Sequence, residues 1–127
     1  MRNIVLAAAA AVLLIPAGAL ADAHSEIVIA DQHAGLAAGA SDIATVHAHL
    51  HHALNCLVGS GGKGYDASQL NPCGNSGKGA IPDAADAAKK KALEAAAARA
   101  REGIASNDAA AAKKAASDVA GMLKKVE

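Results

Sequence analysis

A glycine-rich segment, residues 59–82, constrains the fold of this chain more than any other feature. It reads GSGGKGYDASQLNPCGNSGKGAIP and holds seven of the chain's 12 Gly and two of its three Pro. Because Gly and Pro interrupt both helices and strands, this density predicts a loop. A loop this long in a small domain is usually functional or held in place by a bond. The segment therefore separates two halves of the chain that form regular structure on either side of it.

Alanine predicts that both halves are helical. Of the 127 residues, 37 are Ala, and the sequence has one Tyr, no Phe and no Trp. Ala is the best helix former and is depleted in β-strands. We therefore expect an all-α fold, a four-helix bundle of two tandem helical hairpins joined by the disulfide-tethered loop 59–82. The length suits a single domain, which we place at residues 24–126.

The clearest helical period lies before the loop. Its apolar residues are spaced by three and four, which is typical of one helix face, namely Ile43, Val46, Leu50, Leu54 and Leu57. A helix is expected from Ser41-Asp42, which offer an N-cap, to Gly59. The other expected helices cover residues 25–38, residues 83–102 and a last stretch that begins after a cap at Ser106, Asn107 or Asp108 and ends near residue 126. Gly39 before Ser41-Asp42 matches Gly103 before Asn107-Asp108, which suggests that the two hairpins arose by duplication.

The first 21 residues have the features of a cleaved secretory signal. Arg2 precedes an apolar run that is too short to span a bilayer comfortably, and small residues at A-x-A spacing follow Pro16 and Gly18. Cleavage after Ala21, or alternatively after Ala23, leaves a periplasmic or secreted protein with no membrane segment. The formal net charge of +0 argues against nucleic acid as a partner.

Two cysteines, Cys56 and Cys73, remain in the exported chain. In an oxidising compartment such a pair predicts one disulfide. The bond would tie the loop down and contribute roughly 3 kcal/mol of stability by the chain-entropy model. The competing interpretation is a zinc site built from both cysteines with His49 and His52.

Histidines suggest a metal site in the first half of the chain. His47 and His51 are four residues apart and lie beside the apolar stripe of their predicted helix, a common chelating arrangement. If the preceding turn centres near residue 40, His33 and His47 are equally far from it on antiparallel helices. We therefore expect His33, His47 and His51 to bind one ion as the first-choice site. Three neutral imidazoles suit copper, zinc or nickel.

A second predicted site uses the other face of the same helix. His49 and His52 are three residues apart, and the tethered loop would cover them. Tyr65, Asp66 or Asn71 from that loop could add an oxygen ligand or orient a ring.

His24 is a candidate for a third, terminal site. Cleavage after Ala21 leaves Asp22-Ala23-His24, a pattern that resembles the start of serum albumins, where the amine, two amides and a His nitrogen chelate Cu(II) or Ni(II). Cleavage after Ala23 leaves His24 itself as the first residue, with an amine and an imidazole that could bind copper.

Ala-rich, His-bearing helical hairpins behind a signal sequence resemble the small periplasmic His-rich helical metal-binding proteins of bacteria. The resemblance covers residues 26–58 best and residues 83–126 only in architecture. It implies binding of a divalent metal, copper as first choice, for buffering, storage or delivery. The second hairpin has no His and the chain adds a loop and a Cys pair, which favours one or two defined sites.

A protein without metal is the alternative. In that case the chain is a disulfide-locked structural or interaction module whose loop 59–82 meets a periplasmic partner protein. Both interpretations allow a monomer or a homodimer. We do not expect an enzyme, because no Ser/His/Asp or Cys/His arrangement is evident and the cysteines should be paired.

Overall fold

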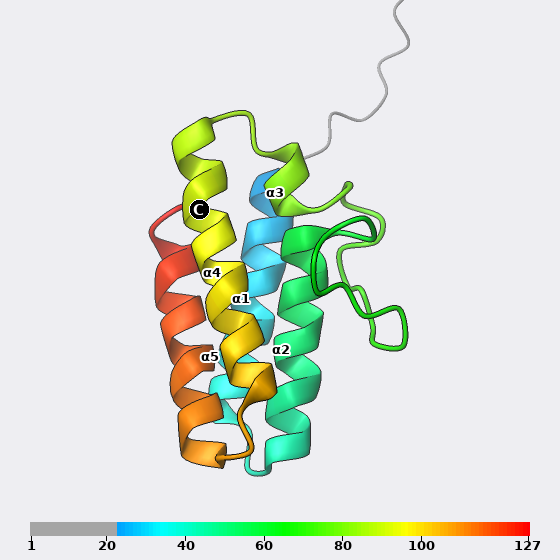
Figure 1. The fold of residues 1–127 in the computed structure, drawn as a ribbon. Helices are drawn as coiled ribbons and strands as arrows, with labels where there is room; N and C mark the ends of the chain where they lie inside the picture. The colour runs from blue at the N-terminus through cyan, green and yellow to red at the C-terminus, as the bar shows by residue number, and fades with distance from the viewer. Residues whose placement is uncertain (1–22) are drawn as a thin grey trace, which may run out of the picture.

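The computed structural model describes residues 23–127, which form five helices and no strand (Figure 1). The helices are α1 (Ala23–Gly39), α2 (Ile43–Val58), α3 (Ala80–Asp83), α4 (Ala87–Ala105) and α5 (Ala109–Lys124). The expected all-α fold is confirmed for these residues. None of these helices is both long and apolar enough to cross a membrane. The predicted signal sequence, residues 1–21, lies outside the described part of the chain.

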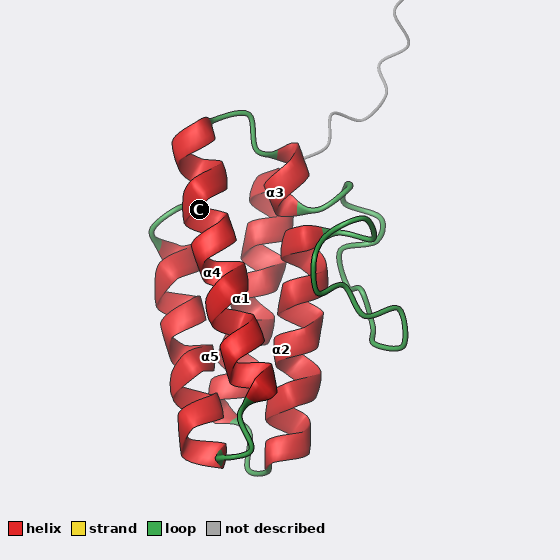
Figure 2. Cartoon of the chain, viewed as in Figure 1, coloured by secondary structure: helices red, strands yellow, loops and turns green. Residues whose placement is uncertain are grey.

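The four long helices lie side by side. α1 contacts α2 and α5, and α4 contacts the same two helices. The short connections 40–42 and 106–108 lie at the same end of the molecule, whereas the long loop leaves the opposite end and runs along the outer side of α2 (Figure 2). Each half of the chain thus contributes two neighbouring helices that run in opposite directions.

Aspartate N-caps begin three of the long helices. The side chains of Asp42, Asp86 and Asp108 each accept a hydrogen bond from a backbone N–H two or three residues later, at 2.9, 2.6 and 2.7 Å respectively. Such bonds satisfy donors that have no partner inside the first helical turn. Among the residues predicted to cap the second and last helices, Asp42 and Asp108 are the N-caps.

The helix predicted for residues 83–102 is wrong at its start. Residues 80–83 form the separate short helix α3, and α4 begins only at Ala87, after the Asp86 cap. The side chain of Asp83 turns back and accepts a hydrogen bond from the N–H of Lys78 at 2.7 Å. Ala84 has extended backbone angles, φ −67° and ψ 123°, which end α3. The single helix expected here is therefore divided into α3 and α4.

Gly103 does not end its helix as expected but lies inside α4, where it is buried. A Cβ atom at this position would lie 2.7 Å from Leu50 Cδ1 and 2.9 Å from Ala115 Cβ. The missing side chain therefore lets α4 approach α2 and α5 closely. Gly39, its counterpart in the sequence, has nothing within 4 Å of the same hypothetical atom. The two matching glycines have different roles, so they do not support an internal duplication.

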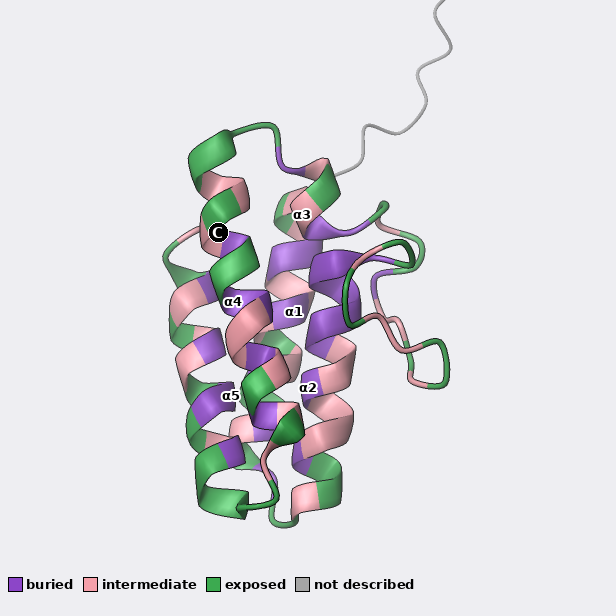
Figure 3. Cartoon of the chain, viewed as in Figure 1, coloured by how far each residue is buried: buried purple, intermediate pink, exposed green. Residues whose placement is uncertain are grey.

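The core contains many small side chains and few large ones. Buried faces line the inside of all four long helices (Figure 3). The largest fully buried apolar side chains are Ile27, Val46, Leu50, Leu54, Leu57, Leu93, Val119 and Leu123. Most of the other buried residues are Ala, which bury little area each but allow close helix packing.

The loop is fastened to α2 by covalent and polar bonds. The predicted disulfide Cys56–Cys73 is confirmed, with Cα atoms 5.1 Å apart and both residues buried. Next to it, the fully buried Asn55 side chain donates to the carbonyl oxygens of Asp66 at 3.0 Å and Leu70 at 3.2 Å, and accepts from the Asp66 N–H at 3.0 Å. The Asn55 side chain thus supplies hydrogen bonds to the backbone of loop residues 66–70, which form no helix or strand of their own.

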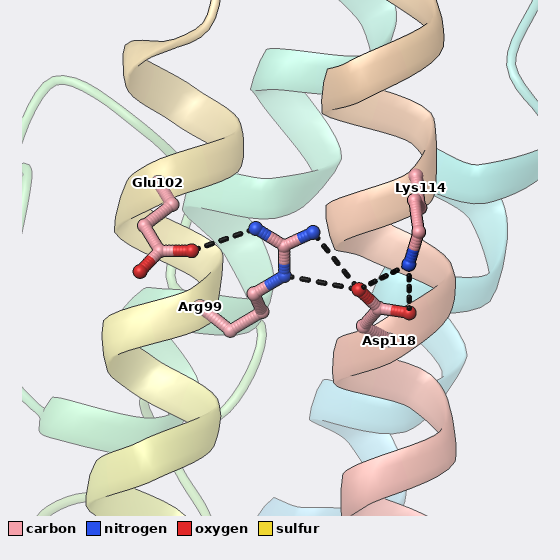
Figure 4. Close-up of polar contacts among 4 residues, drawn as sticks. All are labelled: Arg99, Glu102, Lys114 and Asp118. Atoms are coloured by element: carbon pink, nitrogen blue, oxygen red, sulfur yellow. Dashed lines mark hydrogen bonds and ion pairs between the residues drawn. The ribbon is translucent and has the colours of Figure 1, made fainter.

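Charged side chains join α4 to α5 at the surface (Figure 4). Arg99 donates two hydrogen bonds to one Asp118 carboxylate oxygen, at 3.0 and 2.8 Å, and one to Glu102 at 2.6 Å. Lys114 approaches the same Asp118 carboxylate at 3.0 Å. Hydrogen bonds from Lys114 and Arg99 lower the pKa of Asp118 below its ordinary value.

Candidate metal centre

Three histidine side chains converge between α1 and α2. His33 from α1 and His49 and His52 from α2 each offer a ring nitrogen, and these nitrogens lie within 4.8 Å of one another. The Nδ1 atoms of His33 and His49 are 3.2 Å apart, and the ring centroids of the three pairs are 5.1 to 5.4 Å apart. Within residues 23–127 this is the one group of three or more His, Cys, Asp or Glu with ligand atoms so close. We call it the histidine triad.

The geometry of the α1–α2 hairpin brings the three histidines of the triad together. His49 and His52 are three residues apart on α2, so they share one face of that helix. α1 ends at Gly39 and α2 begins at Ile43, so the centre of the turn is residue 41. His33 and His49 are both eight residues from this centre and therefore lie at the same height on antiparallel neighbours.

The first-choice set of His33, His47 and His51 does not come together. Its prediction placed the centre of the turn at residue 40, one residue too early. An error of one residue at the centre moves the partner of His33 by two residues along α2, which is about 200° around the helix. The facing residue is therefore His49 and not His47.

His47 and His51 make other contacts. His47 Nε2 lies 2.9 Å from the carbonyl oxygen of Ser106, to which it donates, and so links α2 to the turn before α5. His51 Nδ1 lies 3.8 Å from a carboxylate oxygen of Asp66 in the loop. His47 therefore connects two structural elements, His51 lies near the loop, and neither joins the triad.

The pair predicted as the second site, His49 and His52, is brought together, with ring centroids 5.4 Å apart. Its third member is His33 from α1 and not a loop residue. The expected oxygen donors of the loop have other contacts. Asp66 accepts from the N–H and hydroxyl of Ser68, and the Asn71 side chain accepts from a backbone N–H at 3.1 Å.

Tyr65, the remaining loop candidate, is half-buried and packs against the hydrophobic core. The alternative zinc site with two cysteines is also ruled out in this structure. Cys56 and Cys73 are bonded to each other, and residues 23–127 contain no free cysteine. Zinc is bound by thiolates, which a disulfide does not offer.

His24 lies in the first turn of α1 and is exposed. A chelate there needs the amino group that cleavage of the signal sequence would create, so the terminal copper site stays a prediction.

Two histidines of the triad, His33 and His52, have a lowered pKa. Burial is the main cause that lowers the pKa of His33, and the neighbouring His52 and His49 lower it further. The pKa of His52 is lowered by burial first and then by His49 and His51. A neutral imidazole is the form that binds a metal, so these shifts favour the metal-binding form of His33 and His52.

One spacing between nitrogens of the triad matches two ligands of one metal ion, and it also fits a hydrogen bond between the two rings. Two nitrogens bound to one tetrahedral zinc at about 2.0–2.1 Å lie roughly 3.3 Å apart. Adjacent square-planar ligands at the same bond length would lie about 2.9 Å apart. The 3.2 Å between His33 Nδ1 and His49 Nδ1 falls between these values. His52 Nδ1 is buried and has no hydrogen-bond partner among the described residues, and the same is true of His51 Nδ1 outside the triad.

No protein-family model matches the chain, and no curated protein and no solved structure is significantly similar to it.

Proposed function

We propose that this protein binds a divalent transition metal through His33, His49 and His52. The observation that carries the proposal is the convergence of three ring nitrogens within 4.8 Å of one another. Copper is our first choice because imidazole suits it and because it binds most tightly in the general order of divalent metals. Zinc and nickel are the alternatives.

The proposed setting is the bacterial periplasm, with the metal as cargo in buffering or delivery. The signal-like first 21 residues support export, and the Cys56–Cys73 disulfide fits an oxidising compartment. The frame would be a four-helix bundle of two tandem hairpins, in which the first carries the metal. A single defined site favours buffering or delivery over storage of many ions.

The second candidate function is an interaction module without metal. It is favoured by Leu70, which is 61% exposed on a loop that the disulfide and Asn55 hold in place. A large apolar side chain presented on a fixed loop is a suitable contact for a partner protein.

Metal titration decides between the two functions. The chain without its signal sequence, with its amino group blocked to remove the terminal site, is titrated with Cu(II) and with Zn(II). We expect His49→Ala/His52→Ala to weaken binding by more than the roughly 100-fold that loss of an outer partner costs. His33→Ala should weaken it similarly.

The matched control is His47→Ala/His51→Ala, which removes two histidines from the same helix but none from the triad. This variant should bind metal as tightly as the parent chain, with circular dichroism confirming that each variant is helical. Equal loss in both double variants would contradict a specific site. No binding by the parent chain would leave the interaction module as the better function.

A further inference from the structure

The triad supplies three ligands, whereas tetrahedral and square-planar ions take four. The other histidines of α2 have other neighbours: His47 donates to the Ser106 carbonyl, and His51 Nδ1 lies 3.8 Å from an Asp66 carboxylate oxygen. Within residues 23–127 no carboxylate or thiolate belongs to the group. The fourth position of a bound ion is therefore not filled by a His, Cys, Asp or Glu side chain of the described structure.

The triad also lies at the surface. All three histidines are half-buried, and the outward side of α2 shows intermediate burial over several turns (Figure 3). Leu36, one turn after His33 on the same side of α1, is 54% exposed. The triad therefore lies near the surface, and an exposed apolar side chain lies on the same side of α1 as His33.

Charge favours an external donor. Three neutral imidazoles leave both positive charges of a divalent ion uncompensated, because the group includes no carboxylate. An ion in a partly buried site attracts an anion more strongly than it does in bulk water.

On the basis of the proposed function, we infer that the metal on His33, His49 and His52 keeps one coordination position for a monodentate donor from outside. The donor class is a small anion or an imidazole nitrogen. In metal delivery, the ligating side chain of the receiving protein would occupy this position before the three histidines release the ion.

Azide tests for the open position. The blocked, signal-free chain is loaded with one equivalent of Cu(II) and titrated with sodium azide while the visible spectrum is recorded. We expect a new charge-transfer band that saturates at one azide per copper, in the parent chain and equally in the control His47→Ala/His51→Ala. Azide that leaves the spectrum unchanged, or that removes the copper, overturns the inference.

The two proposals fail in different ways. If the titrations show that His33, His49 and His52 do not hold the metal, the proposed function fails before azide is added. If these histidines hold copper and azide does not bind, only the open position is wrong.

Transfer kinetics test the order of events. The zinc-loaded chain is mixed with EDTA in excess, and the loss of bound zinc is followed with time. If the acceptor binds before the histidines release the ion, a tenfold increase in EDTA raises the observed rate about tenfold, as for any step first order in the incoming molecule. A rate that does not depend on EDTA shows that the histidines release the metal first and contradicts the inferred order.

Discussion

The two helical hairpins of this protein share the same arrangement of helices but differ in which functional side chains they contain. α1–α2 and α4–α5 each turn at the same end of the molecule and each have an Asp N-cap on the second helix (Figure 1). All six histidines lie in α1 or α2 of the first hairpin, whereas α4 and α5 of the second hairpin contain none. The capped helices are thus common to both hairpins, whereas the residues of the candidate metal site occur only in the first.

The means of stabilisation differ in the same way. The first hairpin is joined to the loop by the disulfide and by the buried Asn55. The second relies on close Ala and Gly packing, and on surface charge pairs around Asp118 (Figure 4). Exposed ion pairs are weakened by solvent and salt, so the packing carries most of the second hairpin's stability.

The largest expected effect concerns the first hairpin. Reduction of Cys56–Cys73 should lower the free energy of unfolding by about 3 kcal/mol, because the open chain regains the entropy of the loop. The helices should remain, since Ala supports them without the bond. Urea unfolding followed by circular dichroism, with and without a reductant, measures the change. An unchanged midpoint would show that Asn55 and packing hold the loop without the disulfide.

A smaller effect is expected from a glycine pair that compares the hairpins directly. Gly103→Ala places a methyl group against Leu50 and Ala115 and should destabilise the protein by about 2 kcal/mol through overpacking. Gly39→Ala meets no atom within 4 Å and has no positive φ, so it should stabilise the protein by roughly 0.5–1 kcal/mol. Urea midpoints of both variants give the comparison. Shifts of the same sign would contradict the different roles of these glycines.

The smallest effect is the pH dependence of the metal-free protein. His33 and His52 have a lower pKa in the folded state than their ordinary 6.5, so the unfolded chain binds more protons as pH falls. Their contribution to stability is therefore present above pH 6.5 and is lost as pH falls through the folded pKa. The carboxyl of Asp118, in the second hairpin, behaves likewise but only below its ordinary 3.8.

Urea midpoints measured between pH 8 and pH 3 should therefore begin to fall first near 6.5. His33→Gln/His52→Gln should remove this first decline, and Asp118→Asn should affect only the acidic end. A first decline that persists in the double histidine variant would assign it to other groups.

Local signals in the sequence were sufficient for much of the fold. The cap at Asp42, the end of α2 at Gly59 and the apolar period between them all act within a few residues, and the structure confirms them. α3 was missed because Asp83 bonds back to Lys78, a contact that depends on the path of the loop. Gly103 was predicted to end its helix. It is instead a glycine because Leu50 of another helix packs closely against it, and this contact is not visible in the neighbouring sequence.

The metal site was predictable only in part for the same reason. The spacing of His49 and His52 is a local signal, and the pair does come together. The choice of their partner depended on the centre of one turn. His33 was predicted to belong to the site and does lie in the triad, but an error of one residue in that centre paired it with His47 on the wrong side of α2.

The single tyrosine has a consequence for how the molecule can be observed. Tyr65 is the one aromatic residue of the Phe, Tyr and Trp class, and it lies in the loop with its ring against the core. Its intrinsic fluorescence therefore reports on the loop alone, while circular dichroism reports on the helices. Without any added label, the two signals show whether the loop detaches before the helices unfold.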